Sequence, residues 1–161
     1  DALLGGKPVV ATVADWMQVD WADLAQPIEV VFVGYVTSSL GTTMLGGVGL
    51  TVTGIRIRKN GADQWELNAG TALTDSTPDT DPHLFRAVAN GASSALFLDE
   101  SSIASGNAGT NGYNGLTLFA NGGTTNAITG AAAFVGIKAG ALTSTERSDL
   151  HAFCQSRYGT P

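Results

Sequence analysis

Apolar and polar side chains alternate along most of the chain up to about residue 140. This period of two is typical of β-strands that bury one face. In residues 50–58 it places Ile55 and Ile57 on one side and Arg56 and Arg58 on the other. The segment IEVVFVGYV, residues 28–36, is instead almost continuously apolar and β-branched, which predicts a central strand packed on both faces.

About ten short strands are predicted, separated by segments rich in glycine, asparagine and proline. The pair Asn60-Gly61 indicates a hairpin, because both residues accept a positive φ. The segment 105–115 is predicted to be a loop. The expected strands are 7–13, 16–21, 28–36, a short one within 38–47, 50–58, 64–70, 83–91, 95–100, 116–120 and 129–140.

The last segment changes from the period of a strand to that of a helix. Thr143 can cap a helix, and Glu146 three residues later completes a capping box. Leu150, Phe153 and Cys154 then fall on one apolar stripe. The sequence therefore predicts one α-helix over about 143–158.

This order of elements predicts an all-β fold: a two-sheet antiparallel jelly-roll β-sandwich with one C-terminal α-helix. No predicted helix lies between strands, which argues against a parallel α/β sheet. No repeat of about 20–50 residues is present, which argues against a propeller or a solenoid. With 161 residues, the chain is expected to form one domain, 1–161.

Charge excludes two classes of partner. The formal net charge is −6, and the densest basic cluster is Arg56, Arg58 and Lys59. Nucleic-acid binding needs more grouped cations than this, and anionic membranes would repel the surface. No apolar run approaches the roughly 18 residues of a membrane-spanning helix. Cys154 is the single cysteine, so no intrachain disulfide can form, and its place on the apolar stripe predicts a buried, inert thiol.

The last half of the chain resembles a known family. The segments that carry the resemblance are HLFRAVANGASSALFLDESSIASG (83–106), GTNGYNGLTLFANGG (109–123) and AAFVGIKAGALTSTERSDLHAFCQSRYG (132–159). They are similar to the C-terminal half of concanavalin A-like lectin/glucanase domains of the laminin-G type, and residues 7–36 fit the family's opening more loosely. The resemblance implies a jelly-roll fold and an association with bacteriophage tail or capsid proteins and with bacterial surface proteins.

Catalysis is not expected. Glucanases on this fold carry a Glu-x-Asp-x-x-Glu motif that places two carboxylates across the scissile bond. No glutamate here begins such a motif; the four are Glu29, Glu66, Glu100 and Glu146. His83 and His151 are present, but no Gly-x-Ser-x-Gly nucleophile elbow accompanies them.

An acidic loop is the candidate metal site, and calcium is the one cofactor considered. Asp75, Asp79 and Asp81 crowd into one proline-bounded segment, and calcium prefers such oxygen ligands. The resemblance adds that laminin-G-type domains hold calcium at the rim of the sandwich. The alternative is a solvated acidic loop that keeps the protein soluble.

A second loop is the candidate glycan site. Tyr113 lies between Asn111 and Asn114 in a glycine-rich segment, which combines an aromatic platform with hydrogen-bonding amides. Asparagine and glycine are also the residues of ordinary turns. Trp16 and Trp21 are alternative platforms, although their strand spacing favours core or edge packing.

Two functions follow as expectations. The first is a non-enzymatic structural or surface-display domain of a bacteriophage virion, as a capsid decoration or tail-associated protein at the virion surface. Its partners would be virion proteins or further copies of itself as a homo-oligomer. The alternative is a carbohydrate-binding module that recognises a host-surface glycan as receptor. A glycoside hydrolase is the least favoured reading, because the paired carboxylates are missing.

Overall fold

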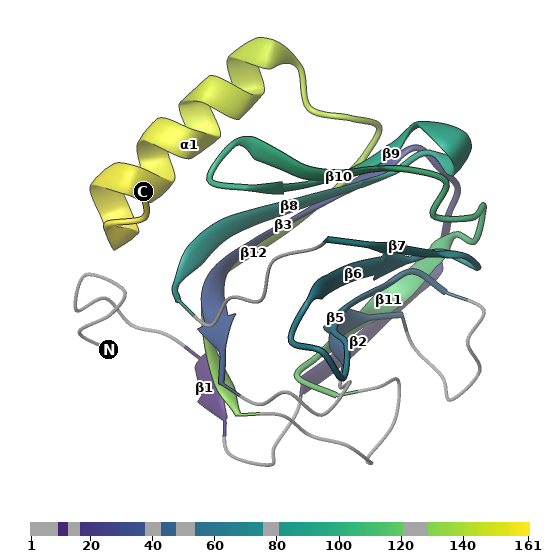
Figure 1. The fold of residues 1–161 in the computed structure, drawn as a ribbon, viewed down its shortest axis with the longest axis horizontal. Helices are drawn as coiled ribbons and strands as arrows, with labels where there is room; N and C mark the ends of the chain where they lie inside the picture. The colour runs from purple at the N-terminus through teal and green to yellow at the C-terminus, as the bar shows by residue number, and fades with distance from the viewer. Residues whose placement is uncertain (1–9, 13–16, 38–42, 48–53, 76–80, 121–128) are drawn as a thin grey trace.

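A computed structural model describes residues 10–12, 17–37, 43–47, 54–75, 81–120 and 129–161. These residues form two six-stranded antiparallel sheets and one C-terminal helix (Figure 1). The predicted fold class, an all-β two-sheet sandwich with a single terminal helix, is therefore confirmed.

The first sheet is built around the strand predicted to be central. Its order is β1 (Val10–Thr12), β12 (Gly130–Ala139), β3 (Ile28–Val36), β8 (His83–Ala89), β9 (Ser94–Leu98) and β10 (Ser101–Gly106). The β3 strand pairs with β12 on one side and with β8 on the other, so it is flanked by strands from the middle and the last part of the chain. A short 3₁₀ turn, η2 (Gly91–Ser93), joins β8 to β9.

The second sheet faces the first. Its order is β2 (Met17–Leu24), β11 (Tyr113–Leu118), β4 (Thr43–Gly46), β5 (Arg56–Lys59), β6 (Trp65–Asn68) and β7 (Ala72–Thr74). The hairpin between β5 and β6 contains the Asn60-Gly61 pair, as predicted. The positive φ falls on Asp63 (φ 60°), because the loop is longer than a two-residue turn and Asn60 Oδ1 accepts hydrogen bonds inside it.

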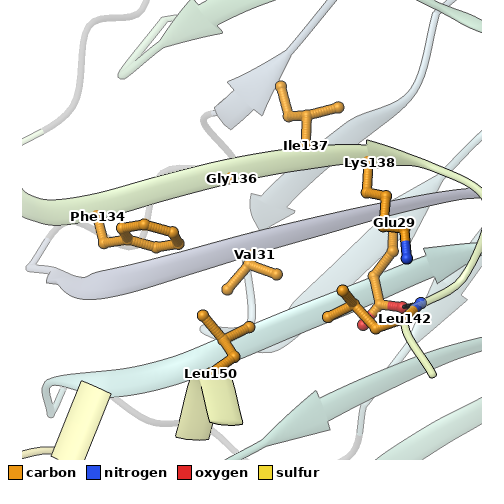
Figure 2. Close-up of a pocket in the computed structure, with 8 residues that line it drawn as sticks. All are labelled: Glu29, Val31, Phe134, Gly136, Ile137, Lys138, Leu142 and Leu150. Atoms are coloured by element: carbon orange, nitrogen blue, oxygen red, sulfur yellow. Dashed lines mark hydrogen bonds between the residues drawn. The ribbon is translucent and has the colours of Figure 1, made fainter. Parts of the chain in front are cut away.

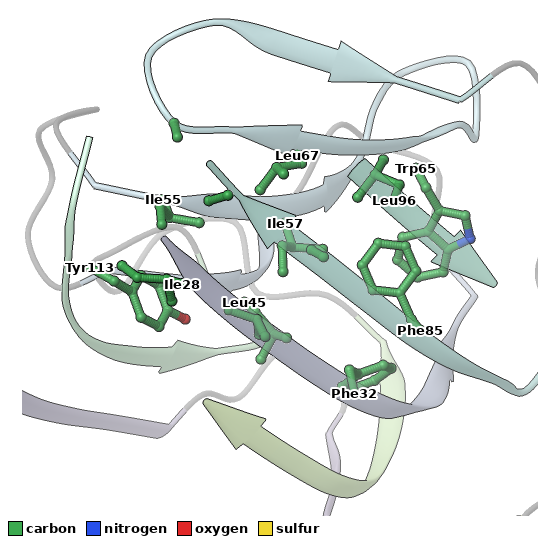
Figure 3. Packing of buried hydrophobic residues seen from close by; sticks show 14 of the residues in the cluster. Ile28, Phe32, Leu45, Ile55, Ile57, Trp65, Leu67, Phe85, Leu96 and Tyr113 are labelled. Atoms are coloured by element: carbon green, nitrogen blue, oxygen red, sulfur yellow. The ribbon is translucent and has the colours of Figure 1, made fainter. Parts of the chain in front are cut away.

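The main core fills the space between the sheets (Figure 3). Alternation sends Phe32 of β3 and Phe85 of β8 inward from the first sheet. From the second sheet, Ile57, Trp65 and Leu67 point toward them, as the alternating pattern predicts. The Trp65 and Phe85 rings lie 4.7 Å apart between centroids. Such pairs add about 0.5–1.5 kcal/mol beyond the area that they bury.

A second apolar layer lies on the outer face of the first sheet, under α1 (Ser144–Tyr158) (Figure 1). Val31, Val33 and Leu84 contact Cys154 and Tyr158 of the helix there. The β3 strand is thus buried on both faces, which confirms the prediction from its continuous apolar pattern. Burial, with a smaller contribution from Glu100, raises the pKa of the Cys154 thiol to about 11, so it stays protonated at neutral pH.

The helix begins where the sequence predicts. The Thr143 side chain accepts a hydrogen bond from the Glu146 backbone N–H at 3.2 Å, and the Glu146 carboxylate accepts one from Thr143 N–H at 2.7 Å. Lys138 of β12 also binds Glu146, at 2.7 Å. Hydrogen bonds from Lys138 and Thr143 lower the pKa of Glu146 to about 2. Gly159 ends the helix in a left-handed conformation.

Two predictions about strands are wrong. Residues 113–115 belong to β11 and 105–106 to β10, so the segment 105–115 is not a loop throughout. The small polar residues of β10 give no strand pattern; pairing with β9 holds them in place. The β2 strand is also less buried than its alternation predicts, because it lies at the edge of its sheet: Met17 is 54% and Val19 52% exposed.

Candidate functional site

Tyr113, the proposed glycan platform, is a core residue. Its side chain is 1% exposed, and Figure 3 shows the ring among the inter-sheet core residues. Pairing with Leu24 of β2 places it there, and burial raises the pKa of its hydroxyl. A buried ring offers no face to a sugar in solvent. The assignment of Tyr113 as a stacking platform is therefore corrected.

The two asparagines beside Tyr113 lie against different turns. The Asn111 side chain lies next to Gly70, and the Asn114 side chain lies next to Gly47 and Gly54. A Cβ atom at Gly47 would stand 2.6 Å from Asn114 Oδ1, so a larger residue there would require the Asn114 side chain to shift. Both asparagines are partly exposed, but they do not gather around one aromatic ring.

Trp21, one of the alternative platforms, reaches the surface, and Tyr113 packs against it from the core. The indole is half-buried at the edge of the core, and its Nε1–H donates to the Tyr113 carbonyl oxygen at 3.1 Å. The two rings meet edge to face, 5.7 Å apart. Hydrogen bond and ring contact together fix the orientation of the indole. Trp16, the other alternative, lies outside the described residues.

Trp21 lines a cleft that opens between the two sheets. Ala22 and Leu24 of β2 and Ile137 of β12 form the rest of its wall, and its volume is about 440 Å³. This volume falls within the range of small-molecule sites, roughly 300–1,000 Å³. The cleft is therefore a fixed aromatic surface in an apolar recess.

The acidic loop is described only in part. Asp75 is buried and its backbone N–H donates to Trp65 O at 2.9 Å, whereas Asp81 is exposed. Asp79 lies outside the described residues. Within the described ranges, no three His, Cys, Asp or Glu side chains gather closely enough to hold a metal ion. The calcium site stays a prediction.

A buried ionic cluster that the sequence analysis missed lies under the helix. Arg86 of β8 is 1% exposed and donates to both carboxylate oxygens of Glu100, at 2.8 and 3.1 Å. It also binds Glu29 of β3, which is 1% exposed. The guanidinium lies 4.3 Å from the centre of the Phe97 ring. Arg86 thus joins the carboxylate of Glu29 on the neighbouring strand β3 to that of Glu100 in the turn between β9 and β10.

Glu29 also connects this cluster to the helix. Its second carboxylate oxygen accepts a hydrogen bond from Leu142 N–H at 2.7 Å, just before α1 (Figure 2). Glu29 is the one charge in an otherwise apolar buried strand. A charge in such a position requires an opposite charge nearby, and this signal could have pointed to the cluster before the structure.

An unusual turn holds Glu100 in place. Asp99 and Glu100 form the two-residue turn between Leu98 of β9 and Ser101 of β10, with φ values of 45° and 66°. A two-residue hairpin turn of this kind requires a positive φ at both central residues, which residues other than glycine adopt uncommonly. Asp99 is anchored by Leu84 N–H at 2.9 Å and by His83 Nδ1 at 2.5 Å.

A polar cavity of about 370 Å³ lies between this turn and α1. Glu100 forms one wall, and the helix contributes Ser144, Arg147, Ser148 and His151. Every group that lines it carries a hydrogen-bond donor or acceptor. Its position on the outer face of the first sheet separates it from the Trp21 cleft, which opens between the sheets.

An apolar groove of about 190 Å³ lies further along the same face (Figure 2). Val31, Phe134, Leu142 and Leu150 line it, and Gly136 leaves room because a Cβ there would stand 3.1 Å from the Phe134 ring. The polar atoms of Glu29 and Lys138 at its border are already hydrogen-bonded. This groove is the seam along which the helix docks.

No family model matches the sequence. No curated protein matches it either. The fold does match solved structures. It is similar to Trypanosoma rangeli sialidase, with TM-score 0.63 and 11% identity over 90% of this chain and 27% of that chain. It is also similar to Domain 4 of AbnA, a GH43 extracellular arabinanase from Geobacillus stearothermophilus in complex with arabinotriose. There the TM-score is 0.59 with 13% identity, over 91% of this chain and 82% of that chain.

These likenesses establish the fold. They are consistent with the concanavalin-like jelly roll expected from the resemblance in the last half of the sequence. The chain spans between 22% and 29% of the sialidase chains that it matches, but most of the AbnA domain. In the described part of the chain, no helix is long and apolar enough to cross a membrane.

Proposed function

We propose that this chain is a carbohydrate-binding module without catalytic activity of its own, and that a sugar binds in the Trp21 cleft. The observation that carries the proposal is the fixed, half-exposed indole in a recess of about 440 Å³. A further support is the match over most of its length to a domain that was solved with a bound trisaccharide.

The chemistry of the cleft suits a sugar ring. The C–H groups on one face of a sugar are apolar and pack against an indole, while its hydroxyls need hydrogen-bond partners. Exposed Asp23, next to Ala22 on β2, can accept hydrogen bonds from such hydroxyls. Because Trp21 is already held by Tyr113, binding costs little side-chain entropy.

The ion pairs that the glutamates form support a non-enzymatic role. Glycosidases use two carboxyl groups that flank the scissile bond. Here every glutamate is engaged in an ion pair with a basic side chain. The pairs are Glu29 and Glu100 with Arg86, Glu66 with Arg58, and Glu146 with Lys138.

Replacement of Trp21 tests the proposal. Trp21→Ala is expected to weaken binding of an oligosaccharide at least tenfold, about 1.4 kcal/mol, because it removes the stacking surface. Isothermal titration calorimetry with a panel of neutral oligosaccharides that includes arabinotriose measures this. Phe153→Ala is the matched control: Phe153 is 45% exposed on α1, away from the cleft, and should bind like the wild type. If no sugar of the panel binds the wild type, or if Trp21→Ala binds equally well, the proposal fails.

A second candidate function is display on a bacteriophage virion, on a capsid or a tail. Besides the resemblance in the sequence, the edge strand β2 favours it. Met17 and Val19 point to the core side of the sheet, opposite Leu118 and Leu116, yet more than half of each side chain is exposed. Exposed apolar side chains on an edge strand are suited to bury against a virion protein or another copy of the chain.

A charged residue introduced on the edge strand β2 tests the second candidate function. Val19→Asp is expected to convert a self-associating wild type to monomers, because burying an unpaired carboxylate in an apolar contact is costly. Analytical ultracentrifugation measures the change, with Gln18→Asp on the opposite side of the strand as control. A wild type that is monomeric at all concentrations would contradict self-association.

A further inference from the structure

We propose that the polar cavity between the β9–β10 turn and α1 is a second ligand site, which takes an uncharged polyol the size of a monosaccharide. It goes beyond the proposed function because it uses neither Trp21 nor the cleft between the sheets. The cavity volume of about 370 Å³ has room for a single sugar ring.

The first argument is that the floor of the cavity is rigidly built. Glu100 contributes the carboxylate there, and its side chain is 27% exposed. Arg86 donates hydrogen bonds to both oxygens of the Glu100 carboxylate. Arg86 is in turn held by an ion pair with Glu29 and by the Phe97 ring, which packs against its guanidinium. A group that is fixed by buried partners and still open to a cavity is prepared to bind a ligand.

The second argument is the set of groups that face Glu100. The Arg147 guanidinium has no ion-pair partner among the described residues, so its donors are available. Ser148 Oγ donates to Ser144 O at 3.1 Å and keeps its lone pairs. His151 Nε2 donates to Pro161 O at 2.9 Å, which leaves Nδ1 as an acceptor in the neutral ring. Donors and acceptors thus converge on one space from a turn and a helix.

The third argument is charge, and it decides the class of ligand. Of the residues that line the cavity, Glu100 carries one negative charge and Arg147 one positive charge. The sum is zero when His151 is neutral, so neither a lone anion nor a lone cation is favoured. A pair of adjacent hydroxyls is favoured, because each hydroxyl can donate to Glu100 and accept from Arg147.

The tight turn is consistent with this site. Asp99 and Glu100 both adopt the positive φ that a two-residue hairpin turn requires. The turn brings Glu100 onto Arg86 and to the edge of the cavity.

The test is a titration of the whole chain with monosaccharides, monitored by two-dimensional NMR. Titration with L-arabinose, D-galactose and D-mannose is expected to give saturable shifts for the backbone amides of residues 144–151 with at least one sugar. Trp21→Ala should keep these shifts, since the cleft is separate. Arg147→Ala should weaken the binding at least tenfold, and Ser148→Trp should abolish it by filling the cavity.

Arg157→Ala is the matched control, because Arg157 is an exposed arginine of the same helix outside the cavity. It should bind as the wild type does. The proposal is overturned if no sugar shifts these amides, if Arg147→Ala and Ser148→Trp bind normally, or if sulfate binds and no sugar does. Shifts that vanish with Trp21→Ala would assign binding to the cleft and also overturn the second site.

Discussion

Arg86→Ala is expected to lower the free energy of unfolding by about 3–5 kcal/mol. The substitution leaves the Glu29 carboxylate without its cation in a site that is 1% exposed to solvent. It also removes both hydrogen bonds that hold Glu100 over the first sheet. Urea denaturation at neutral pH, followed by tryptophan fluorescence, measures the loss.

Two comparisons show whether buried charge is the cause. Arg86→Met combined with Glu29→Leu removes the buried pair together and should recover much of the stability, because the one charge left without its partner, Glu100, is 27% exposed to solvent. Lys138→Ala breaks an ion pair whose two side chains are 38% and 46% exposed, so its effect should be far smaller. Equal losses for Arg86→Ala and Lys138→Ala would refute this account of the cluster.

Gly109→Ala is expected to cost about 3 kcal/mol, the second large effect. Gly109 has φ +92°, and a Cβ atom there would stand 2.2 Å from Ala69 O. The segment around it is hydrogen-bonded to the β6–β7 turn: Ala108 O accepts from Ala69 N–H at 2.7 Å, and Ala69 O accepts from Asn111 N–H at 2.8 Å. A side chain at Gly109 would force these backbones apart.

The matched control is another glycine of the chain. Gly61→Ala lies in the β5–β6 hairpin, where nothing stands within 4 Å of an added Cβ and φ is not positive. Its stability should stay close to that of the wild type, as for most surface substitutions. Thermal unfolding of both variants decides the matter; a Gly109→Ala variant as stable as Gly61→Ala would contradict the close approach seen in the structure.

The features that the sequence predicts correctly are those with a local cause. The apolar run of β3, the alternation that buries Ile57 and Trp65, and the capping box of α1 each depend on residues close together in the chain. Their side chains fix the local backbone and the face that is buried. Fold class follows from the order of these elements.

The features that the sequence does not predict depend on distant pairings. A register shift between Tyr113 and Gly115, where β11 meets β2, accompanies the burial of the Tyr113 ring and leaves Trp21 at the surface. The ionic cluster of Glu29, Arg86 and Glu100 likewise depends on which strands are neighbours in the sheet. Apart from Glu29, these residues are unremarkable within their own segments. The candidate site therefore moved from a predicted loop to an edge strand.

The place of β3 has a consequence for synthesis on the ribosome. This strand is made before its partners β8 and β12, which lie at residues 83–89 and 130–139. The hydrogen bond from Leu142 N–H to the Glu29 carboxylate forms later still. Pairing between such distant segments is slow to form. The newly made strand must therefore wait, with its apolar side chains unprotected, until the segment up to Leu142 has been translated.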